Sequence, residues 1–342
     1  MTQLYPVFVL LTILVFCFTY VNGFRDGCNV VATLIASRAM KPTPALVFAA
    51  VVELLSPFTV LVIGSSVSDT IQKLVDASAY TAPESQTIGL LFLTAGIIAA
   101  IVWNLSTWFF AIPSSSSHAL IGGVIGAGIM AFGWRTISWG YFWTRVVLMI
   151  FLTPLLSFLV GWLLMKGLLL LACNLSARAA PFFRYAQYVN MVFLAFNHSF
   201  NDSQKSTGIL MILIGICFGD APAQIPLWAI GAAACALALG ILTGGLKIIK
   251  TVGTGIYRVR PIHSFASQLS SGIVILGASL VGAPVSASQI VSSSIIGVGS
   301  AERYKGVKWN VAGKILISWI ITVPIAGAIG ALLLAVLRFI FL

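Results

Sequence analysis

The segment NGFRDGCN, residues 22–29, carries an arginine, an aspartate and two asparagines in the middle of an apolar run. That run begins near Leu4 and continues to about Arg38, which is longer than one transmembrane helix requires. A charged side chain inside a membrane span costs about 2.5 kcal/mol or more, so charges in such a place mark a candidate functional site. We therefore expect a membrane helix that is broken or tilted around residues 22–29.

The composition supports this membrane assignment. Of the 342 residues, 59% are hydrophobic and only 8% are charged, and the mean hydropathy is +1.05. A soluble chain normally has about a quarter of its residues charged, whereas repeated apolar stretches of about 20 residues are typical of transmembrane helices. The first apolar run has no basic segment before it, so it does not resemble a cleavable signal peptide. The sequence predicts an all-α integral membrane protein that crosses the cell inner (plasma) membrane several times and contacts the lipid bilayer.

The net charge of +11 does not indicate a nucleic-acid partner, because the basic residues fall in short clusters between apolar runs. These clusters contain Arg38, Lys41, Lys247, Lys250, Arg258, Arg260, Arg303, Lys305 and Lys308. Basic loops of this kind are typical of the cytoplasmic side of a membrane protein. The five cysteines show no metal-ligand spacing, so we expect small buried hydrophobes and no cofactor; they are Cys17, Cys28, Cys173, Cys217 and Cys235.

The second half of the chain repeats the first. Phe-Arg-Asp at residues 24–26 matches Phe-Asn-Asp at residues 200–202. Farther along, IPSSSSH at residues 112–118 matches APVSASQ at residues 283–289. Two motifs in the same order and at nearly the same separation indicate an internal duplication. We expect a first repeat over residues 1–172, a connector over residues 173–187 and a second repeat over residues 188–342.

The charges of the loops indicate that the two repeats have opposite orientations. The span that follows Pro42 leads from a basic loop to an acidic one with Asp69, Asp76 and Glu84. Its counterpart, about residues 225–246, leads from a loop with Asp220 to a basic loop. Opposite polarity in equivalent spans predicts an inverted-topology repeat transporter. We expect about 10–12 spans or half-spans, discontinuous helices at the polar motifs, two re-entrant Pro-Ser segments, and a substrate site near the midplane.

Four ionisable residues lie within the predicted spans, namely Arg25, Asp26, Asp202 and Lys205. Because intramembrane charges are costly, we expect them to contribute to a binding site. The alternative is that Arg25 with Asp26, and Asp202 with Lys205, form structural ion pairs only. The duplication and the neighbouring Asn29 and Asn201 favour the functional interpretation.

Both proline-serine segments are suited to an oxyanion. Their hydroxyl groups can donate hydrogen bonds, and they belong to Ser114, Ser115, Ser116, Ser117, Ser286 and Ser288. Each segment follows a proline and precedes an expected helix, so free N–H groups and the positive end of the helix dipole could point at a bound anion. The alternative is that the serines cap a helix start or let helices pack closely.

His118 ends the first serine segment, and its counterpart in the second half is Gln289. His118 could donate to a substrate, carry a proton or bond a neighbouring carbonyl, and the same alternatives hold for His198. A serine beside a histidine is also found in hydrolases. However, no third residue at a recognisable spacing orients His118, and the sequence has no nucleophile elbow, so we expect no enzyme.

Together these motifs resemble those of the inorganic phosphate transporter (PiT) family, in its compact bacterial form. NGFRDGCN at residues 22–29 is similar to the first signature of that family, and FNDSQK at residues 200–205 is similar to the second. The segments PSSSSH and PVSASQ, at residues 113–118 and 284–289, resemble its paired proline-serine motifs. The resemblance extends from residue 22 to about residue 330.

The resemblance implies secondary active transport of inorganic phosphate by an inverted-repeat homodimer, with H⁺ or Na⁺ as the coupling ion. It implies that Asp26, Asn29, Asn201 and Asp202 line the substrate and cation sites, as metal ligands only if coupling is to sodium. The serines of both segments would hold the anion. The expected substrate-binding residues are Arg25, Asp26, Asn29, Ser114, Ser115, Ser116, Ser117, His118, Asn201, Asp202, Lys205, Ser286, Ser288 and Gln289.

The sequence also departs from the family pattern. Arg25 stands where a histidine or asparagine is usual, Gly27 and Cys28 replace alanine-like residues, and Gln289 replaces a second histidine. Lys205 stands where the first repeat has an asparagine, and a fixed cation there could do the work of one sodium ion. We therefore expect symport with protons rather than with sodium.

Phosphate and sulfate have the same shape and size, so the choice between them depends on protonation. Phosphate near neutral pH keeps a proton that a carboxylate can accept, whereas sulfate meets only repulsion. Asp26 and Asp202 favour phosphate if they face the anion; if cations cover them, a sulfate permease on the same scaffold is the alternative. A passive anion channel is the alternative of another class, and a midplane site built from both halves favours alternating access over it.

Overall fold

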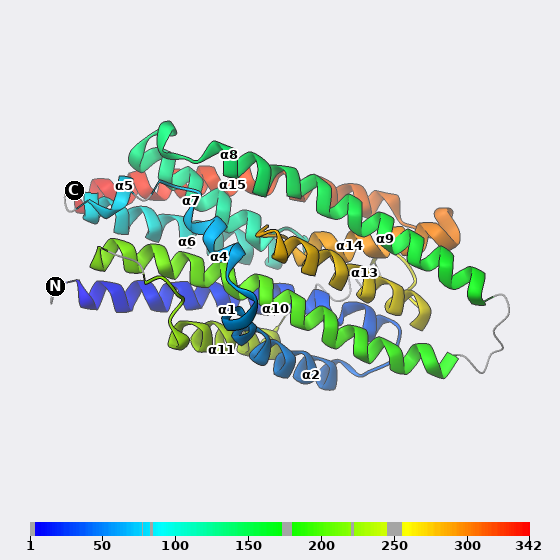
Figure 1. Cartoon of the computed structure of the whole chain (residues 1–342). Helices are drawn as coiled ribbons and strands as arrows, with labels where there is room; N and C mark the ends of the chain where they lie inside the picture. The colour runs from blue at the N-terminus through cyan, green and yellow to red at the C-terminus, as the bar shows by residue number, and fades with distance from the viewer. Residues whose placement is uncertain (1–3, 77, 83–84, 173–179, 220–221, 245–254) are drawn as a thin grey trace.

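The computed structural model describes residues 4–76, 78–82, 85–172, 180–219, 222–244 and 255–342, and in these ranges the chain is helical almost throughout (Figure 1). Five of the helical segments described are long and apolar enough to cross a membrane, which confirms the all-α membrane class. They are Tyr5–Ala36, Pro42–Ile63, Gln86–Phe109, Trp139–Leu171 and Trp309–Phe341. Several residues named above lie outside the described ranges, namely Glu84, Cys173, Asp220, Lys247 and Lys250, as do residues 173–179 of the expected connector.

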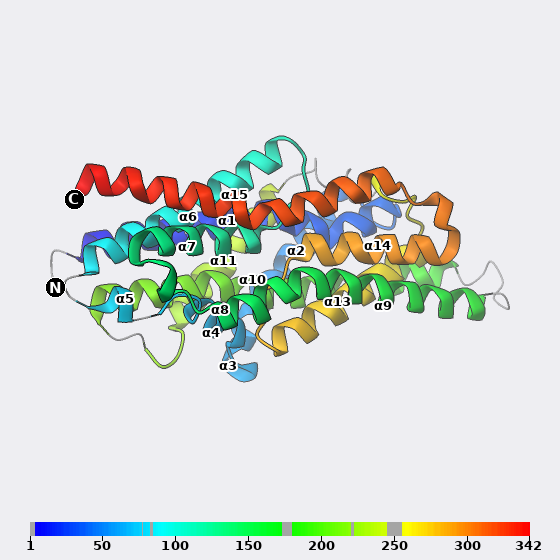
Figure 2. The ribbon, with the colours of Figure 1, turned by 90° about the horizontal axis from the view of Figure 1, so that it is seen from above.

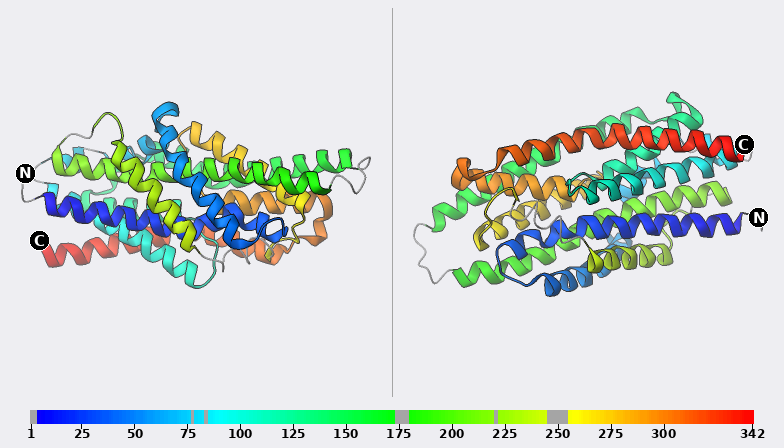
Figure 3. Two further views of the ribbon diagram at one scale, coloured as in Figure 1. Left: turned by 90° about the horizontal axis from the view of Figure 1, so that it is seen from below. Right: turned by 180° about the vertical axis from the view of Figure 1, so that it is seen from behind.

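Two long helices, α1 (Tyr5–Ala36) and α10 (Ala180–Phe218), lie side by side along the molecule and run in opposite directions (Figures 1 and 3). Residues 180–187, which we expected in the connector, form the first turns of α10. Both helices continue through their polar motifs, so the expectation of a helix broken at residues 22–29 is wrong.

This continuity has a simple physical reason. Neither polar motif contains a proline, and an unbroken helix satisfies its own backbone hydrogen bonds inside a membrane. At 1.5 Å per residue, the 32 residues of α1 extend over about 48 Å, enough to cross a hydrocarbon layer of about 30 Å without a break. The polar side chains at residues 22–29 are therefore held on a rigid helix.

The chain breaks instead at the two proline-serine segments. α6 (Gln86–Phe109) and α7 (Ser116–Phe132) form hairpin 1, which begins at the end of the molecule where both termini lie. α13 (Pro261–Leu280) and α14 (Ala287–Arg303) form hairpin 2, which begins at the opposite end (Figures 1 and 2). In each hairpin the residue two positions before the proline has a positive φ, 53° at Ala111 and 73° at Gly282. Both expected re-entrant Pro-Ser segments are thus present.

The remaining helices enclose these elements. α2 (Pro42–Leu55) continues through a 3₁₀ turn, Ser56–Thr59, into α3 (Val60–Ile63), and α11 (Leu227–Thr243) packs against α1 and α2. Two short helices, α4 (Ser66–Gln72) and α5 (Ser78–Thr81), follow in the acidic loop. On the other side of the bundle, α9 (Leu148–Ala172) packs against hairpin 2, and α15 (Trp309–Phe341) packs against hairpin 1 (Figure 2).

The starts of the last two spans have the same local structure. Trp139, which opens α8 (Trp139–Tyr141), stacks on Trp134 with 4.1 Å between the ring centroids and donates from Nε1 to the Trp134 carbonyl at 3.0 Å. Trp309, which opens α15, lies 4.7 Å from the ring of Tyr304 and donates from Nε1 to the Tyr304 carbonyl at 3.2 Å. A π-helical segment, Phe142–Val147, joins α8 to α9.

The interior prolines of these two spans also correspond. Pro154 in α9 and Pro324 in α15 each lie 15 residues after the opening tryptophan. Proline inside a helix removes one backbone hydrogen bond and bends the helix. The two halves of the chain therefore form matching local structures at matching positions, although the two spans point in opposite directions (Figure 3).

Close helix packing fixes the hairpins against their neighbours. A Cβ atom added to Gly126 of α7 would lie 2.0 Å from the carbonyl oxygen of Gly327 on α15, and one added to Gly122 would lie 2.5 Å from the Val323 carbonyl oxygen. In hairpin 2, a Cβ atom at Gly297 would lie 2.1 Å from the Phe158 carbonyl oxygen on α9. Small residues let helix backbones approach in a membrane, where apolar surface alone gives little drive for association.

We expect Gly126→Val to destabilise the protein by about 1–3 kcal/mol, because the atom it meets is backbone and cannot rotate away. The measurement is the thermal unfolding midpoint of the purified protein in detergent. Gly313→Ala on α15 is the control, since a Cβ atom there meets nothing within 4 Å, and its midpoint should equal or slightly exceed that of the wild type. Equal midpoints for the two variants would contradict the role of this contact.

Candidate functional site

The tips of the two hairpins bond directly to each other. Ser117 Oγ donates to the carbonyl of Val285 at 2.8 Å, and Ser288 Oγ donates to the carbonyl of Ser114 at 2.8 Å. These bonds are reciprocal, because Ser117 is matched with Ser288 and Ser114 with Val285 when the two proline-serine segments are aligned. Two segments that are far apart in the sequence thus form one polar centre between α1 and α10.

Serine caps the first turn after each tip. Ser115 Oγ accepts from the backbone N–H of His118 at 3.2 Å, and Ser286 Oγ accepts from that of Gln289 at 3.4 Å. Of the serines expected to bind an anion, these two are therefore already helix caps, which was the alternative interpretation for them. Ser286 Oγ also lies 2.9 Å from Ser288 Oγ.

Asp26 of α1 lies at the tip of hairpin 1. Its carboxylate accepts hydrogen bonds from the hydroxyl of Ser116 and from Nδ2 of Asn29, the latter at 3.3 Å. The side chain of Asp26 is buried, with 2% of the residue surface exposed. Within the described residues Asp26 forms no ion pair, and the groups that contact its carboxylate directly are a hydroxyl and an amide.

Arg25 points away from its neighbour Asp26. Its Nη1 donates to Asn104 Oδ1 on α6 at 2.6 Å, and its Nη2 donates to Ser114 Oγ at 2.6 Å. The expected alternative of an Arg25–Asp26 ion pair is therefore not what the structure contains. Arg25 instead joins α1 to both legs of hairpin 1, and its residue surface is 1% exposed.

Lys205 of α10 lies where the two tips meet. Its Nζ forms an ion pair with Asp202, one helical turn earlier, and donates to Ser117 Oγ at 2.5 Å and to the Val285 carbonyl at 2.7 Å. The expected pair of Asp202 and Lys205 is thus present, and the lysine also contacts both hairpins. Asn22 of α1 donates to Asp202 Oδ2 at 3.0 Å, so the two central helices are joined at this carboxylate.

Asn201 organises the tip of hairpin 2. Its Nδ2 donates to Ser279 Oγ at 2.7 Å and to the carbonyl of Ala283 at 3.1 Å, while its Oδ1 accepts from the backbone N–H of Val285 at 3.3 Å. Arg25 and Asn201 are corresponding residues of the repeat, and each holds the tip of the hairpin beside it. The structure thus places both immediately next to the proline-serine segments.

One titratable residue of this centre was not identified as a candidate from the sequence. Glu53 of α2 is fully buried, and its Oε1 lies 2.9 Å from His198 Nδ1. His198 Nε2 in turn lies 3.2 Å from Asp202 Oδ2. Glu53, His198, Asp202 and Lys205 therefore form a continuous buried chain of ionisable side chains from α2 to the hairpin tips. A signal was present, because Glu53 is the only charged residue between positions 42 and 63.

His118 and Gln289 follow the two caps and are buried. Within the described residues, Nδ1 of His118 and both polar atoms of the Gln289 side chain have no hydrogen-bond partner, and the same holds for Arg25 Nε and Asn29 Oδ1. Buried polar atoms are normally paired. These five atoms belong to the hairpin tips or to α1 beside them, so they are available to a ligand bound there.

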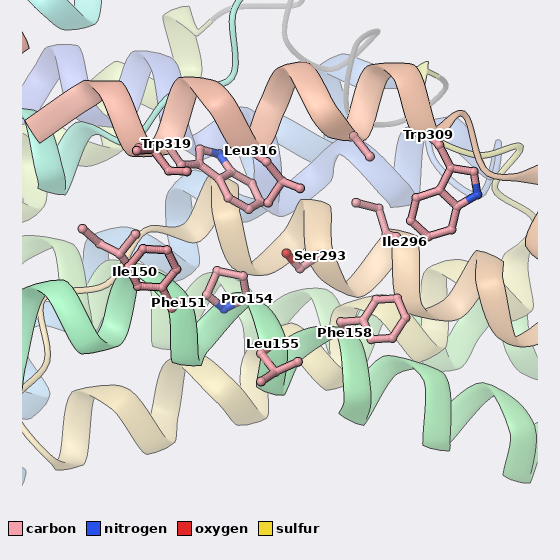
Figure 4. Close-up of a pocket in the computed structure, with 12 residues that line it drawn as sticks. Ile150, Phe151, Pro154, Leu155, Phe158, Ser293, Ile296, Trp309, Leu316 and Trp319 are labelled. Atoms are coloured by element: carbon pink, nitrogen blue, oxygen red, sulfur yellow. The ribbon is translucent and has the colours of Figure 1, made fainter.

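An apolar cavity of about 290 Å³ lies elsewhere, between α9, α14 and α15 (Figure 4). Its walls include Phe151, Pro154, Phe158, Trp309 and Trp319. None of the described residues that line this cavity is charged. It is therefore unsuited to an inorganic anion, unlike the centre formed by the hairpin tips, where hydroxyl, amide, cationic and carboxylate groups converge.

Two re-entrant hairpins with polar tips inside an apolar helical bundle are typical of membrane transport proteins, in which irregular backbone at membrane depth lines the substrate path. The chain belongs to the Phosphate transporter family, which it matches over residues 22–177 and 171–330. Phosphate is the substrate of that family.

Individual relatives agree with this assignment. A Bacillus subtilis (strain 168) protein named "probable low-affinity inorganic phosphate transporter" is 37% identical over 337 residues, which are 97% of this chain and 98% of that protein. A Rhizobium meliloti (strain 1021) protein of the same name is 33% identical over 97% of this chain and 96% of its own length. A solved structure named "The sodium-dependent phosphate transporter" superposes with a TM-score of 0.82 over 98% of this chain and all of that chain, at 24% identity, and this likeness shows the fold.

The family assignment resolves several expectations. It confirms the resemblance inferred from the paired motifs, the multi-pass membrane location, and the view that the protein is a transporter rather than an enzyme. The sulfate alternative is not favoured, because the matching family and the relatives are phosphate transporters.

We expect Lys205→Met to lower the stability of the protein by about 3–5 kcal/mol, because it leaves the buried Asp202 without its lysine partner. Adding Asp202→Asn to the same chain should restore most of the loss, since both charges are then gone. Thermal unfolding of the single and double variants measures this coupling. Lys73→Met, which changes an exposed lysine, is the control; a loss in this control as large as in Lys205→Met would refute the role of burial.

Proposed function

We propose that the protein is a symporter of inorganic phosphate that works by alternating access, with the substrate bound where the two hairpin tips meet. The observation that carries this proposal is the convergence of four elements at one place. α1 brings Asp26, α10 brings Asp202 and Lys205, the tip of hairpin 1 brings Ser116 and Ser117, and the tip of hairpin 2 brings Ser288. Hydroxyl and cationic donors suit the phosphate oxygens, and a carboxylate can accept the proton that phosphate carries near neutral pH.

The arrangement of the halves supports an inverted repeat, with residues 1–172 and 188–342 as its two units. α1 and α10 run in opposite directions, and the two hairpins begin at opposite ends (Figure 1). The reciprocal bonds of Ser117 and Ser288 are those expected of elements related by a two-fold axis. In such repeats, movement of one half against the other opens the central site to each side in turn. We also propose a homodimer, as the family resemblance implies.

The substrate site in this proposal uses groups from both tips. Asn29, Ser114, Ser116, Ser117 and Ser288 would hold the anion after exchange of their present partners, and His118 and Gln289 would offer buried polar atoms that now lack one. Ser115 and Ser286 would contribute through the N-terminal ends of α7 and α14, which they cap. Arg25 and Asn201 would set the position of each tip.

Proton coupling is the finer part of the proposal. Lys205 places a cationic side chain against Asp202 and both tips, which is where a coupling cation would otherwise be needed. Glu53 and His198 extend this group with side chains that can bind and release protons. The name of the solved relative states sodium dependence for that protein. If this chain used sodium, Asp26, Asn29, Asn201 and Asp202 would be the ligands.

Uptake of labelled phosphate into liposomes tests the coupling. We expect a pH gradient, acidic outside, to drive accumulation above equilibrium in sodium-free buffer, and excess unlabelled sulfate to leave it unchanged. Accumulation that requires sodium and does not respond to the pH gradient would show that transport is coupled to sodium and not to protons. Uptake that never exceeds equilibrium would indicate a passive channel, and suppression by sulfate would indicate a sulfate permease.

Asp26→Asn should abolish phosphate uptake in the same assay while leaving a folded protein. Asparagine has the same shape and can still accept from Ser116, so the hairpin contact persists, but the group can no longer bind a proton or balance a cation. Asp69→Asn, in the exposed part of the acidic loop, is the control and should transport at the wild-type rate. Normal uptake by Asp26→Asn would show that this carboxylate is structural.

A further inference from the structure

A second cluster of charged residues lies far from the hairpin tips, at the base of hairpin 2. A cavity of about 550 Å³ there is lined by Tyr257, Arg258, Arg260, His263, Glu302, Arg303 and Gly306. The tip of the hairpin at Ser286 and this cavity at Arg303 are separated by the length of α14, about 25 Å. The cavity is therefore distinct from the proposed transport site.

The wall of this cavity is built rigidly. The ring of Tyr257 packs on two glycines, because a Cβ atom would come within 2.8 Å of it at Gly299 and within 2.9 Å at Gly306. The backbone N–H of Lys308 donates to the carbonyl of Ile256 at 3.0 Å. The segment before α13 is thus fixed on the end of α14 and on the turn that follows it.

The carboxylate of Glu302 in this cavity already has three partners. Glu302 forms an ion pair with Arg260, accepts from the hydroxyl of Tyr257 at 2.6 Å, and lies 2.9 Å from His263 Nε2. His263 Nδ1 accepts from the backbone N–H of Arg260 at 3.0 Å, so the ring carries its proton on Nε2 and donates it to Glu302. A neutral histidine suffices for this network, and Glu302 balances a single arginine.

Two guanidinium groups are left without a counter-charge. Neither Arg258 nor Arg303 forms a side-chain ion pair or hydrogen bond with any residue that the structure describes. Both are exposed, and both line the cavity. The described residues of the lining include three arginines and one glutamate, an excess of two positive charges.

We propose that this cavity is a second anion site, which binds a phosphate group between Arg258 and Arg303. Guanidinium groups bind phosphate through paired hydrogen bonds of fixed geometry, and two of them match the charge of a phosphate dianion. Arg258 precedes α13 and Arg303 ends α14, so the bound group joins the two legs of hairpin 2. The site lies at the end of the molecule that carries the basic loops, which we expect to face the cytoplasm.

The phosphate group can belong to free inorganic phosphate or to the headgroup of an anionic phospholipid, and two measurements separate these sources. In detergent, titration with inorganic phosphate gives the rise in the unfolding midpoint. In nanodiscs with phosphatidylglycerol, native mass spectrometry counts the lipids retained by each chain. Neither measurement is an uptake assay, so the result does not depend on whether the proposed symport mechanism is correct.

The test variant is Arg258→Gln/Arg303→Gln, and the control is Lys305→Gln/Lys308→Gln, which removes two charges from the adjoining loop without altering the cavity lining. A difference in the phosphate titration identifies free phosphate as the ligand, and a difference in retained lipid identifies the headgroup. We expect the test variant to bind at least about tenfold more weakly than the control, because it loses the charge-assisted hydrogen bonds of both guanidinium groups. Equal behaviour of the two variants in both measurements would overturn the proposal.

A conservative variant covers a failure of the glutamine variant to fold. Arg258→Lys/Arg303→Lys keeps both charges but loses the forked geometry of the guanidinium group. We expect it to bind more weakly than the wild type in whichever measurement detects the ligand. The proposal would be wrong if Arg258→Lys/Arg303→Lys bound as tightly as the wild type while the Lys305→Gln/Lys308→Gln control lost binding. Binding would then depend only on the general positive charge of this end of the molecule.

Discussion

Two helical hairpins that end inside a membrane leave backbone groups without helical partners, and the rest of this structure depends on how those groups are satisfied. Each tip supplies a hydrogen-bond partner to the other, because Ser117 donates to the Val285 carbonyl and Ser288 donates to the Ser114 carbonyl. Asn201 of α10 satisfies further groups by bonding the Ala283 carbonyl and the Val285 N–H. The serine bonds join segments from different halves, so each tip takes a partner from the other half.

The scaffold is nearly symmetric, but its charges are not. Around Asp26 the cation precedes the carboxylate and the asparagine follows it, whereas around Asp202 the order is reversed. As a result, Arg25 contacts hairpin 1 alone, and Lys205 contacts both hairpins and neutralises Asp202. Of the two central carboxylates, Asp26 is therefore the one without a lysine or arginine in direct contact among the described residues. This makes Asp26 a better candidate than Asp202 for a group that gains and loses a proton or a cation.

The close glycine contacts and the unbroken central helices both hold the groups of the site in fixed positions. Close contacts such as that of Gly126 with Gly327 hold one leg of hairpin 1 against a full span. α1 and α10 carry their polar side chains on rigid backbone, so the charged groups reach the tips in a fixed geometry. The site is thus formed by irregular backbone from two hairpins and regular backbone from two helices.

The sequence alone determined the membrane class, the two breaks at proline-serine segments and the family. These features depend on hydropathy over about 20 residues and on local residue preferences, which act along the chain. It misplaced the breaks at residues 22–29, because a polar residue interrupts a hydropathy pattern without interrupting a helix.

Only the tertiary structure decided which side chains meet. Arg25 bonds Asn104 and Ser114 instead of its neighbour Asp26, and Glu53 lies against His198, 145 residues away in the chain. Loop charge and periodicity indicate that helices exist and how they are oriented, but they do not specify which helices are neighbours. That choice depends on the shapes of packed surfaces, such as the glycine contacts, and on the need to pair every buried charge, which can be met only once the whole bundle has assembled.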